Sequence, residues 1–292
     1  MCGRFNLLTT KILFCRIQSY ATIAAMFDNL LSSVVALIYL SLAGLFAHRL
    51  VSKAHSPGKQ KLLNIGIVTV LIHAYLVIRN LHTPSGLDLS FFTVFSLISL
   101  TITGMVLFAS WREPIESLAI GVLPIAALAV LMRMSSDQHH HLTESLSLGL
   151  EFHIVVSIVA YSLLSLAALQ SIFLYVHDAH LHNKHPGGFV RALPPLETME
   201  RMLFRFIAVG FVVLSISLVS GAFYIEDILG QHLVHKTVLS AGAWILFAVL
   251  LWGRRKFGWR GKTAIRWTLT GFALLLLAYF GSKFVIELVL QR

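Results

Sequence analysis

The chain has 292 residues, of which 57% are hydrophobic and 12% charged, with a mean hydropathy of +0.80. This composition excludes an ordinary soluble domain, because the polar residues are too few to cover its surface. A net charge of +10 could indicate nucleic-acid binding. The basic residues are instead divided among short links between apolar segments, so we expect the lipid bilayer, and no nucleic acid, as a partner.

Cys2 and Cys15 are the only cysteines, and both precede the first apolar segment. They argue against a disulfide framework and against a zinc site. Residues 1–25 also lack the apolar core of a signal peptide. We therefore expect translation to begin at Met26, with residues 1–25 as a non-native or disordered extension and residues 26–292 as one membrane domain.

Eight apolar stretches follow one another along the rest of the chain. Hydrocarbon about 30 Å thick requires roughly 20 apolar residues of helix for each crossing. The sequence therefore predicts an all-α polytopic membrane protein, a bundle of eight transmembrane helices. The predicted spans are residues 28–49, 63–81, 91–111, 115–133, 148–176, 203–225, 234–253 and 265–289.

The Lys and Arg residues predict how these spans are oriented. If the odd-numbered links face the cytoplasm, they contain 15 of the 23 Lys and Arg residues, whereas the other links and the C-terminus contain five. Cytoplasmic loops of membrane proteins show this excess of basic residues. We therefore expect both termini on the outer side of the membrane.

The second predicted span contains His73 about ten residues from either end. A charged residue at that depth costs about 2.5–3.5 kcal/mol on a lipid face, so we expect a neutral ring that points into the bundle. Two interpretations remain open. One is a helix–helix hydrogen bond to a Ser, Thr or Tyr, and the other is a haem ligand or proton relay within the membrane.

Two more histidines lie near the ends of different spans, and the predicted topology places both ends on the outer side. His153 begins the fifth span, and His235 and Lys236 precede the seventh. Tyr161 follows His153 by eight residues, a difference of about 80° around a helix, so both side chains can border one bundle-facing sector.

Two other segments are rich in histidine, at residues 139–141 and 177–185. Neither has the Cys or acidic partners of a known metal site, and consecutive histidines in a loop point in different directions. We expect both segments to be solvated links, the first on the outer side and the second in the cytoplasm.

Four motifs, in order, carry a resemblance to a known family. The chain reads H-x7-Y at the start of the fifth span, LPPLETMER before the sixth, GWRG after the seventh and AYFGSK in the eighth. This order resembles the cytochrome c assembly superfamily of the CcsA, CcmC and HemX type, and most closely its YpjD-type inner-membrane members. The resemblance extends from about His48 to the C-terminus and implies a bacterial inner membrane, with both termini periplasmic.

The resemblance implies that the protein handles haem. His153 takes the place of the first external histidine of the family, His235 lies where a Trp-rich haem-binding segment would be, and His73 is similar in depth to an intramembrane histidine. Haem needs neutral imidazoles for iron and cations for its propionates. We expect His153 and His235 to be the metal ligands, with Lys236 and Tyr161 in the same cofactor-binding site.

These features predict a haem-binding protein that assists cytochrome c assembly or haem trafficking, together with other maturation proteins. The chain departs from the family in having no WxWD sequence. It shows no nucleophile with a base and no nucleotide-binding loop, so we do not expect an enzyme. Two alternatives remain: an ion-coupled transporter with His73, Lys283 and Glu287 along a polar path, and a membrane assembly scaffold without a cofactor.

Overall fold

The structure, a computed structural model, describes residues 5–52, 58–83, 86–113, 115–134, 141–142, 147–182, 193–224 and 231–281. Nearly all of these residues are helical. The helices are α1 (Phe5–Val51), α2 (Lys59–Leu81), α3 (Phe91–Ala109), α4 (Glu116–Met134), α5 (Leu148–His182), α7 (Leu196–Tyr224), α8 (Gln231–Phe257) and α9 (Gly261–Leu276). Strands β1 (His82–Thr83), β2 (Gly86–Asp88) and β3 (His141–Leu142) pair antiparallel in the order β1-β2-β3.

Seven of the described helices, α1 to α5, α7 and α8, are long and apolar enough to cross a membrane. The prediction of an all-α polytopic membrane protein is therefore confirmed. The predicted eighth span coincides with α9, which continues as a π-helical turn at Leu277–Gly281, where the described part of the chain ends. The count of eight crossings thus stays a prediction.

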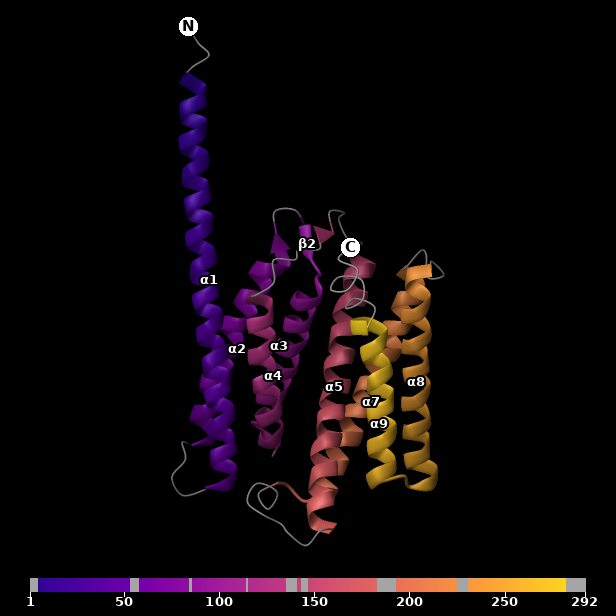
Figure 1. Cartoon of the computed structure of the whole chain (residues 1–292). Helices are drawn as coiled ribbons and strands as arrows, with labels where there is room; N and C mark the ends of the chain where they lie inside the picture. Colours follow the sequence, from indigo (N-terminus) through magenta and orange to yellow (C-terminus); the bar gives the residue numbers. More distant parts are fainter. Residues whose placement is uncertain are drawn as a thin grey trace.

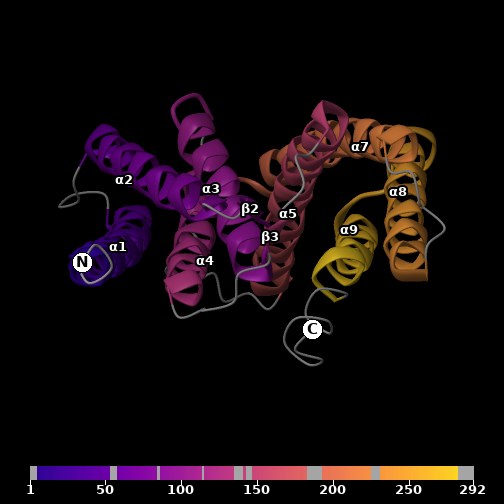
Figure 2. The same ribbon diagram turned by 90° about the horizontal axis from the view of Figure 1, so that it is seen from above.

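The helices pack as two neighbouring groups (Figure 1, Figure 2). The first group, α1 to α4, encloses an apolar core that includes Tyr39, Phe46 and Leu123, and the second, α5 and α7 to α9, encloses one that includes Leu164 and Phe247. Helix α3 contacts α5, which joins the two groups. Each helix buries one apolar side and leaves other apolar side chains at the surface, as expected in lipid.

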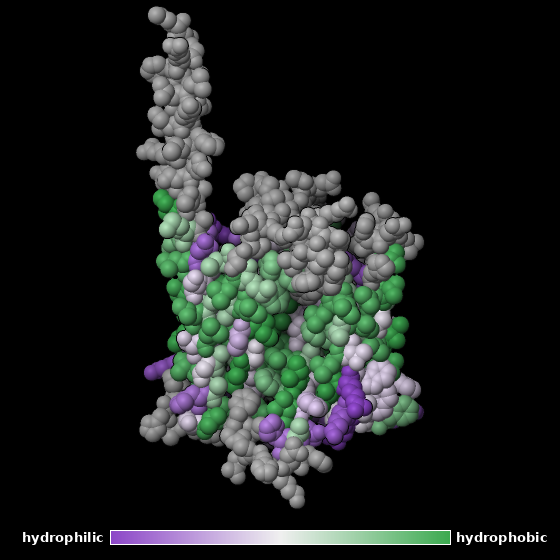
Figure 3. Space-filling view, viewed as in Figure 1, coloured by the Kyte–Doolittle hydropathy of each residue, from purple (hydrophilic) through white to green (hydrophobic). Residues whose placement is uncertain are grey.

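The two ends of the bundle differ in character. The strand end carries β1 to β3 and the beginnings of α5 and α8, whereas the basic end carries the α8–α9 turn (Figure 1). Arg254, Arg255 and Lys256 lie in the last turn of α8. Figure 3 shows apolar side chains across the middle of the molecule and hydrophilic ones near its lower edge. Which side of the membrane each end faces stays a prediction.

Ion pairs join neighbouring helices at the basic end. Glu116, in the first turn of α4, lies 3.4 Å from Nε of Arg49 and 2.9 Å from Nζ of Lys59. Glu113, in the α3–α4 turn, lies 3.1 Å from a guanidinium nitrogen of Arg205 on α7. The α3–α4 turn therefore contacts basic side chains from both helix groups.

The GWRG motif forms the turn between α8 and α9. Gly258 and Gly261 have φ angles of 66° and 50°, in the left-handed region that favours glycine. The buried carboxylate of Glu200 accepts hydrogen bonds from Arg254 at 3.2 Å, from Arg260 at 3.2 Å and from the main-chain N–H of Gly261 at 3.3 Å. The two glycines of the motif are thus explained by their φ angles, and its arginine by the hydrogen bond to Glu200.

Two sequence-based expectations about links need correction. Helix α5 continues to His182, past the predicted end of the span at residue 176. The segment from 177 to 182 is therefore helical and not a linker. His141, in the predicted outer loop, lies in β3 opposite Asp88. Helix α1 begins at Phe5, whereas a start of translation at Met26 and the domain boundary at residue 26 stay predictions.

Candidate functional site

His153 lies in the second turn of α5, against α7. A Cβ atom built on Gly221 of α7 would be 2.9 Å from Cε1 of the imidazole, and one built on Gly149 of α5 would overlap the ring of Tyr224. Real Cβ atoms essentially never make such contacts. Glycine at these two positions therefore lets each ring rest directly on the backbone of the opposite helix.

The hydrogen bonds of His153 determine which ring nitrogen carries the proton. Nδ1 lies 3.0 Å from the main-chain oxygen of Ser217 and 3.1 Å from Oγ of Ser220. A carbonyl oxygen can only accept, so Nδ1 donates its proton and Nε2 of the neutral ring keeps its lone pair. Within the described residues, Nε2 has no hydrogen-bond partner. Metal-binding histidines are held in this way.

A row of serines supports this arrangement. Oγ of Ser157 donates to the main-chain oxygen of His153 at 2.6 Å and lies 2.7 Å from Oγ of Ser217, while Oγ of Ser220 donates to the main-chain oxygen of Ser217 at 2.9 Å. None of Ser157, Ser217 and Ser220 was singled out from the sequence as a site residue. The sequence spacing could have identified Ser157, because it follows His153 by one helical turn and so lies on the same face of the helix.

Three exposed aromatic side chains lie close to His153 or its contact residue Gly221 in the sequence, at the strand end. Phe152 is 50% exposed, and Phe223 and Tyr224, in the last turn of α7, are 79% and 51% exposed. Tyr224 also borders Gly149, one turn before His153. The half-buried imidazole therefore lies at the same end of α5 and α7 as aromatic side chains that are accessible from outside the bundle.

Tyr161 faces the bundle as expected and contacts α9, whereas its assignment to the cofactor site stays a prediction. Its hydroxyl donates to the main-chain oxygen of Leu275 on α9 at 2.5 Å, and its ring meets that of Tyr279 edge to face at 5.9 Å. The π-helical turn begins at Leu277, two residues after the carbonyl that accepts this bond. Tyr161 thus links α5 to α9.

His235 and Lys236 lie in the second turn of α8, at the same end of the bundle as the start of α5 (Figure 1). The side chain of His235 lies outside the described part of the structure, and Lys236 is half-buried. The structure therefore agrees with the predicted common end of His153 and His235, but their roles as ligands stay a prediction. Lys283 and Glu287 lie outside the described residues.

His73 is buried between α1, α2 and α3, with 1% of its surface exposed. Nδ1 lies 3.2 Å from the hydroxyl of Tyr39, and Nε2 lies 2.9 Å from Oγ of Ser96. Both ring nitrogens are therefore occupied by hydroxyl groups from neighbouring helices. This geometry matches the helix–helix hydrogen bond that the sequence left open as one interpretation. A role of His73 in cofactor binding stays a prediction.

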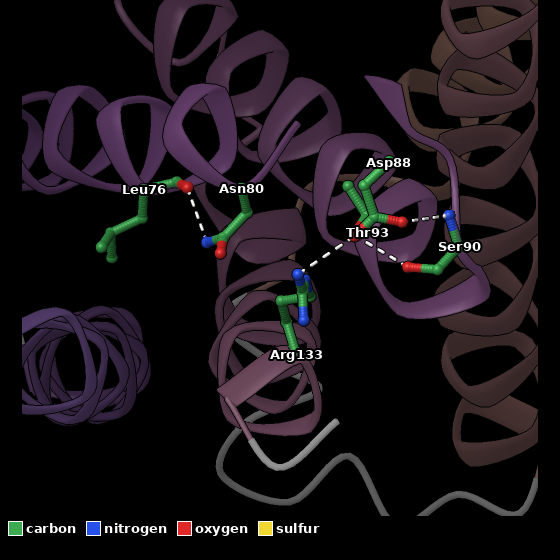
Figure 4. Close-up of polar contacts among 6 residues, drawn as sticks. All are labelled: Leu76, Asn80, Asp88, Ser90, Thr93 and Arg133. Atoms are coloured by element: carbon green, nitrogen blue, oxygen red, sulfur yellow. Dashed lines mark hydrogen bonds and ion pairs between the residues drawn. The ribbon is translucent and has the colours of Figure 1, made fainter. Parts of the chain in front are cut away.

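A second buried polar cluster, which sequence reasoning missed, lies at the strand end of the first helix group (Figure 4). The carboxylate of Asp88, with 0% exposure, accepts hydrogen bonds from the main chain of Ser90 at 2.9 Å, from Thr93 at 3.1 Å and from Arg133 at 3.1 Å. Burial by itself raises the pKa of Asp88, but these hydrogen bonds and the charge of Arg133 together lower it below its ordinary value.

His177, expected in a solvated cytoplasmic link, is buried near the basic end. Only 7% of its surface is exposed, and Nδ1 lies 3.4 Å from Sδ of Met199 on α7. His180, one turn later, is exposed. No group of three or more His, Cys, Asp or Glu residues that could hold a metal ion is found in the searched part of the chain.

Comparison with known proteins adds a family to this geometry. Residues 62–290 match the family described as Cytochrome C assembly protein. The inner membrane protein YpjD of Escherichia coli K12 is 36% identical over 207 residues, which are 70% of this chain and 78% of that protein. A cytochrome c biogenesis protein CcsA of Synechococcus is 25% identical over 276 residues, or 84% and 90% of the two chains. No solved structure gives a significant match.

Proposed function

The chain belongs to the Cytochrome C assembly protein family, and on that premise we propose that it binds haem at His153 and assists cytochrome c assembly or haem trafficking. The observation that carries this proposal is the hydrogen bond between Nδ1 of His153 and the main-chain oxygen of Ser217. Because this bond fixes the proton on Nδ1, the lone pair of Nε2 is available to iron. In this role the protein is a carrier or chaperone of haem and not an enzyme.

The surroundings of His153 suit a porphyrin. A macrocycle needs an apolar surface, and the exposed rings of Phe152, Phe223 and Tyr224, at the same end of α5 and α7 as His153, would supply one. Gly221 carries no side chain that could displace the ring from its acceptor on α7. If haem binds here, His153 would hold an iron that can be reduced and a porphyrin that can be transferred to an acceptor protein.

We assign the second iron ligand to His235 and the partner of a haem propionate to Lys236. Both residues lie in the second turn of α8, and α8 begins at the strand end, as α5 does. Ligands from two helices would join the outer ends of α5 and α8 through the haem. Tyr161 contributes by holding α9 against α5 and does not contact the ligand.

The cellular setting follows from the relatives. One relative is named an inner membrane protein and another a cytochrome c biogenesis protein. We propose the inner membrane of a bacterium for this chain, with the strand end, the haem site and both termini on the periplasmic side. Other cytochrome c maturation proteins are the proposed partners, because a haem carrier needs a donor and an acceptor.

The test is an absorption titration of the purified protein with haemin. We expect the wild-type protein to give a Soret band typical of histidine-ligated haem. His153→Ala should weaken the affinity at least tenfold, about 1.4 kcal/mol. His180→Ala is the matched control, because His180 lies on the same helix, is exposed, and bonds only to its own helix backbone at the main-chain oxygen of Val176.

Two results would overturn the proposal. The first is a wild-type protein that gives no histidine-type Soret band with haemin, and the second is equal affinity in His153→Ala and wild type. Either result would favour the transporter or the cofactor-free scaffold. A loss of binding in His235→Ala as well as in His153→Ala would assign both ligands, whereas an unchanged His235→Ala would leave His153 as the single protein ligand.

A further inference from the structure

A small cavity lined by both polar and apolar side chains lies inside the first helix group, with Leu76, Val77 and Val130 as its apolar residues. Its polar lining comes from α1 to α4, and the space open to the centre of a water-sized sphere is about 10 Å³. That is about the space that one water molecule needs. The polar residues that line it are Ser32, His73, Asn80, Thr93, Ser96 and Arg133. A cavity of this size with several polar groups in its lining can hold one water molecule.

We propose that this cavity binds one water molecule, and that the water completes a proton relay from the strand end of the bundle to the buried imidazole of His73. The relay is independent of the proposed haem site, because it lies in the first helix group and His153 lies in the second. It would give a membrane-buried histidine access to protons from one side of the membrane.

The spacing on α3 supports a single bridging water. Thr93 and Ser96 are three residues apart, so their Cβ atoms lie about 5–6 Å from each other on one face of the helix. One water with two hydrogen bonds of about 2.8 Å spans such a separation. Both residues line the cavity. The hydroxyls of Thr93 and Ser96 are thus the two groups that the water would connect.

Existing hydrogen bonds hold the hydroxyls on both sides of the water, and those of Ser96 continue the relay to His73. On one side, Thr93 donates to the carboxylate of Asp88 at 3.1 Å. On the other side, Oγ of Ser96 lies 2.9 Å from Nε2 of His73, whose Nδ1 lies 3.2 Å from the hydroxyl of Tyr39. Each hydroxyl can donate one proton and accept another. A gap of one water therefore separates two hydrogen-bonded chains.

The groups around the cavity can also supply all the hydrogen bonds that the water needs. A buried water typically makes about three hydrogen bonds. The oxygens of Thr93 and Ser96 can accept its two protons, and the guanidinium of Arg133, which has five N–H donors, can donate to its oxygen. Figure 4 shows the side chains of Asn80 and Arg133 facing one another next to Thr93, and Asn80 is half-buried. We place the mouth of the cavity beside Asn80.

The proton balance of the relay is simple. A proton that enters from solvent protonates the bound water, which passes a proton to Oγ of Ser96, and Ser96 passes its own proton to Nε2 of His73. The imidazole becomes imidazolium, and no other bond changes. Arg133 stays protonated throughout and supplies only a hydrogen bond. Because a charge at this depth is unfavourable, the neutral ring is the resting state and the proton leaves by the same path.

The experiment measures how fast Nε2 of His73 gains and loses a proton, from the exchange broadening of its ¹⁵N signal as the pH is lowered. The protein is labelled with ¹⁵N-histidine, reconstituted in nanodiscs, and followed by NMR, with His73→Gln to assign the signal. We expect Ser96→Ala to slow the exchange at least tenfold. Ser99→Ala is the matched control, because Ser99 is equally buried on α3 but bonds to the main-chain oxygen of Ser96 and does not line the cavity.

A second variant tests the water without removing a relay hydroxyl. Ser32→Val fills the cavity from α1 and leaves the bond between Ser96 and His73 in place, so we expect it to slow the exchange at least fivefold. Exchange rates that are unchanged in both Ser96→Ala and Ser32→Val would overturn the proposal. Equal slowing in Ser99→Ala would also overturn it, because exchange would then follow opening of the helix group and not the relay.

Discussion

The imidazole of His153 rests on Gly221, and a Cβ at position 221 would lie 2.9 Å from Cε1 of the ring. Because Gly221 of α7 has no side chain, the imidazole of His153 on α5 can lie directly against the α7 backbone. The ring then reaches the main-chain oxygen of Ser217, one turn earlier on α7, at 3.0 Å. Position 221 controls the tautomer of His153 through this contact.

The first prediction concerns Gly221→Ala. The added methyl group pushes the imidazole away from Ser217, so Nδ1 loses its fixed acceptor and Nε2 its orientation. We expect the haemin affinity to fall about tenfold, or about 1.4 kcal/mol, as measured by absorption titration. Gly104→Ala is the control, since a Cβ there meets only Val70 at an ordinary 3.9 Å. Equal affinities in both variants would contradict the role of Gly221.

The second prediction concerns Ser220→Ala. This change removes one neighbour of Nδ1 but leaves the main-chain oxygen of Ser217, which by itself keeps the proton on Nδ1. We therefore expect haemin affinity to change less than about threefold, within the usual net value of one hydrogen bond. A loss as large as that of His153→Ala would show that the hydroxyl, and not the carbonyl, positions the ring.

Tyr161→Phe separates a structural role from a ligand-binding role. The variant loses the hydrogen bond to Leu275, so we expect the free energy of unfolding in detergent to fall by about 0.5–1.5 kcal/mol, with unchanged haemin affinity. Tyr175→Phe, on an exposed position of the same helix, should alter neither quantity. Weaker haemin binding in Tyr161→Phe at unchanged stability would support the original assignment of Tyr161 to the cofactor.

A double-mutant cycle tests the buried ion pair of Asp88 and Arg133, whose side chains are 0% and 10% exposed. Asp88→Asn leaves a cation in the bundle without its counter-charge, and we expect a loss of about 3–5 kcal/mol in unfolding free energy. Combining it with Arg133→Met should recover part of this loss. Additive effects of the two changes would show that the side chains do not interact.

The lowered pKa of Asp88 predicts a pH dependence of stability. The folded-state pKa lies below the unfolded value of about 3.9, so the carboxylate stabilises the fold above about pH 4. This contribution is lost as the pH falls further, through the folded-state pKa. We expect the midpoint of thermal unfolding to drop below about pH 4 more steeply in wild type than in Asp88→Asn. Parallel curves for the two proteins would contradict this assignment.

Some site features could be read from single residues and others could not. The position of His153 near the end of a span followed from the apolar pattern, and so did the depth of His73. The partners could not be read in this way, because Ser217 and Ser96 lie 64 and 23 residues away along the chain. For His177 the prediction was wrong. Its polar surroundings in the sequence predicted a solvated side chain, but Met199 of α7 covers the ring.

By itself, the sequence determined that this is a helical membrane protein, because apolar runs of about 20 residues have no other stable form in lipid. It also indicated the basic end, because Lys and Arg gather in alternate links. Only the tertiary structure decided three contacts: the hydrogen bond from Tyr161 to α9, the packing of His153 on Gly221, and the ion pair of Asp88 and Arg133. These contacts depend on how closely and at which rotation helices pack, and that is set by the side chains of several helices at once.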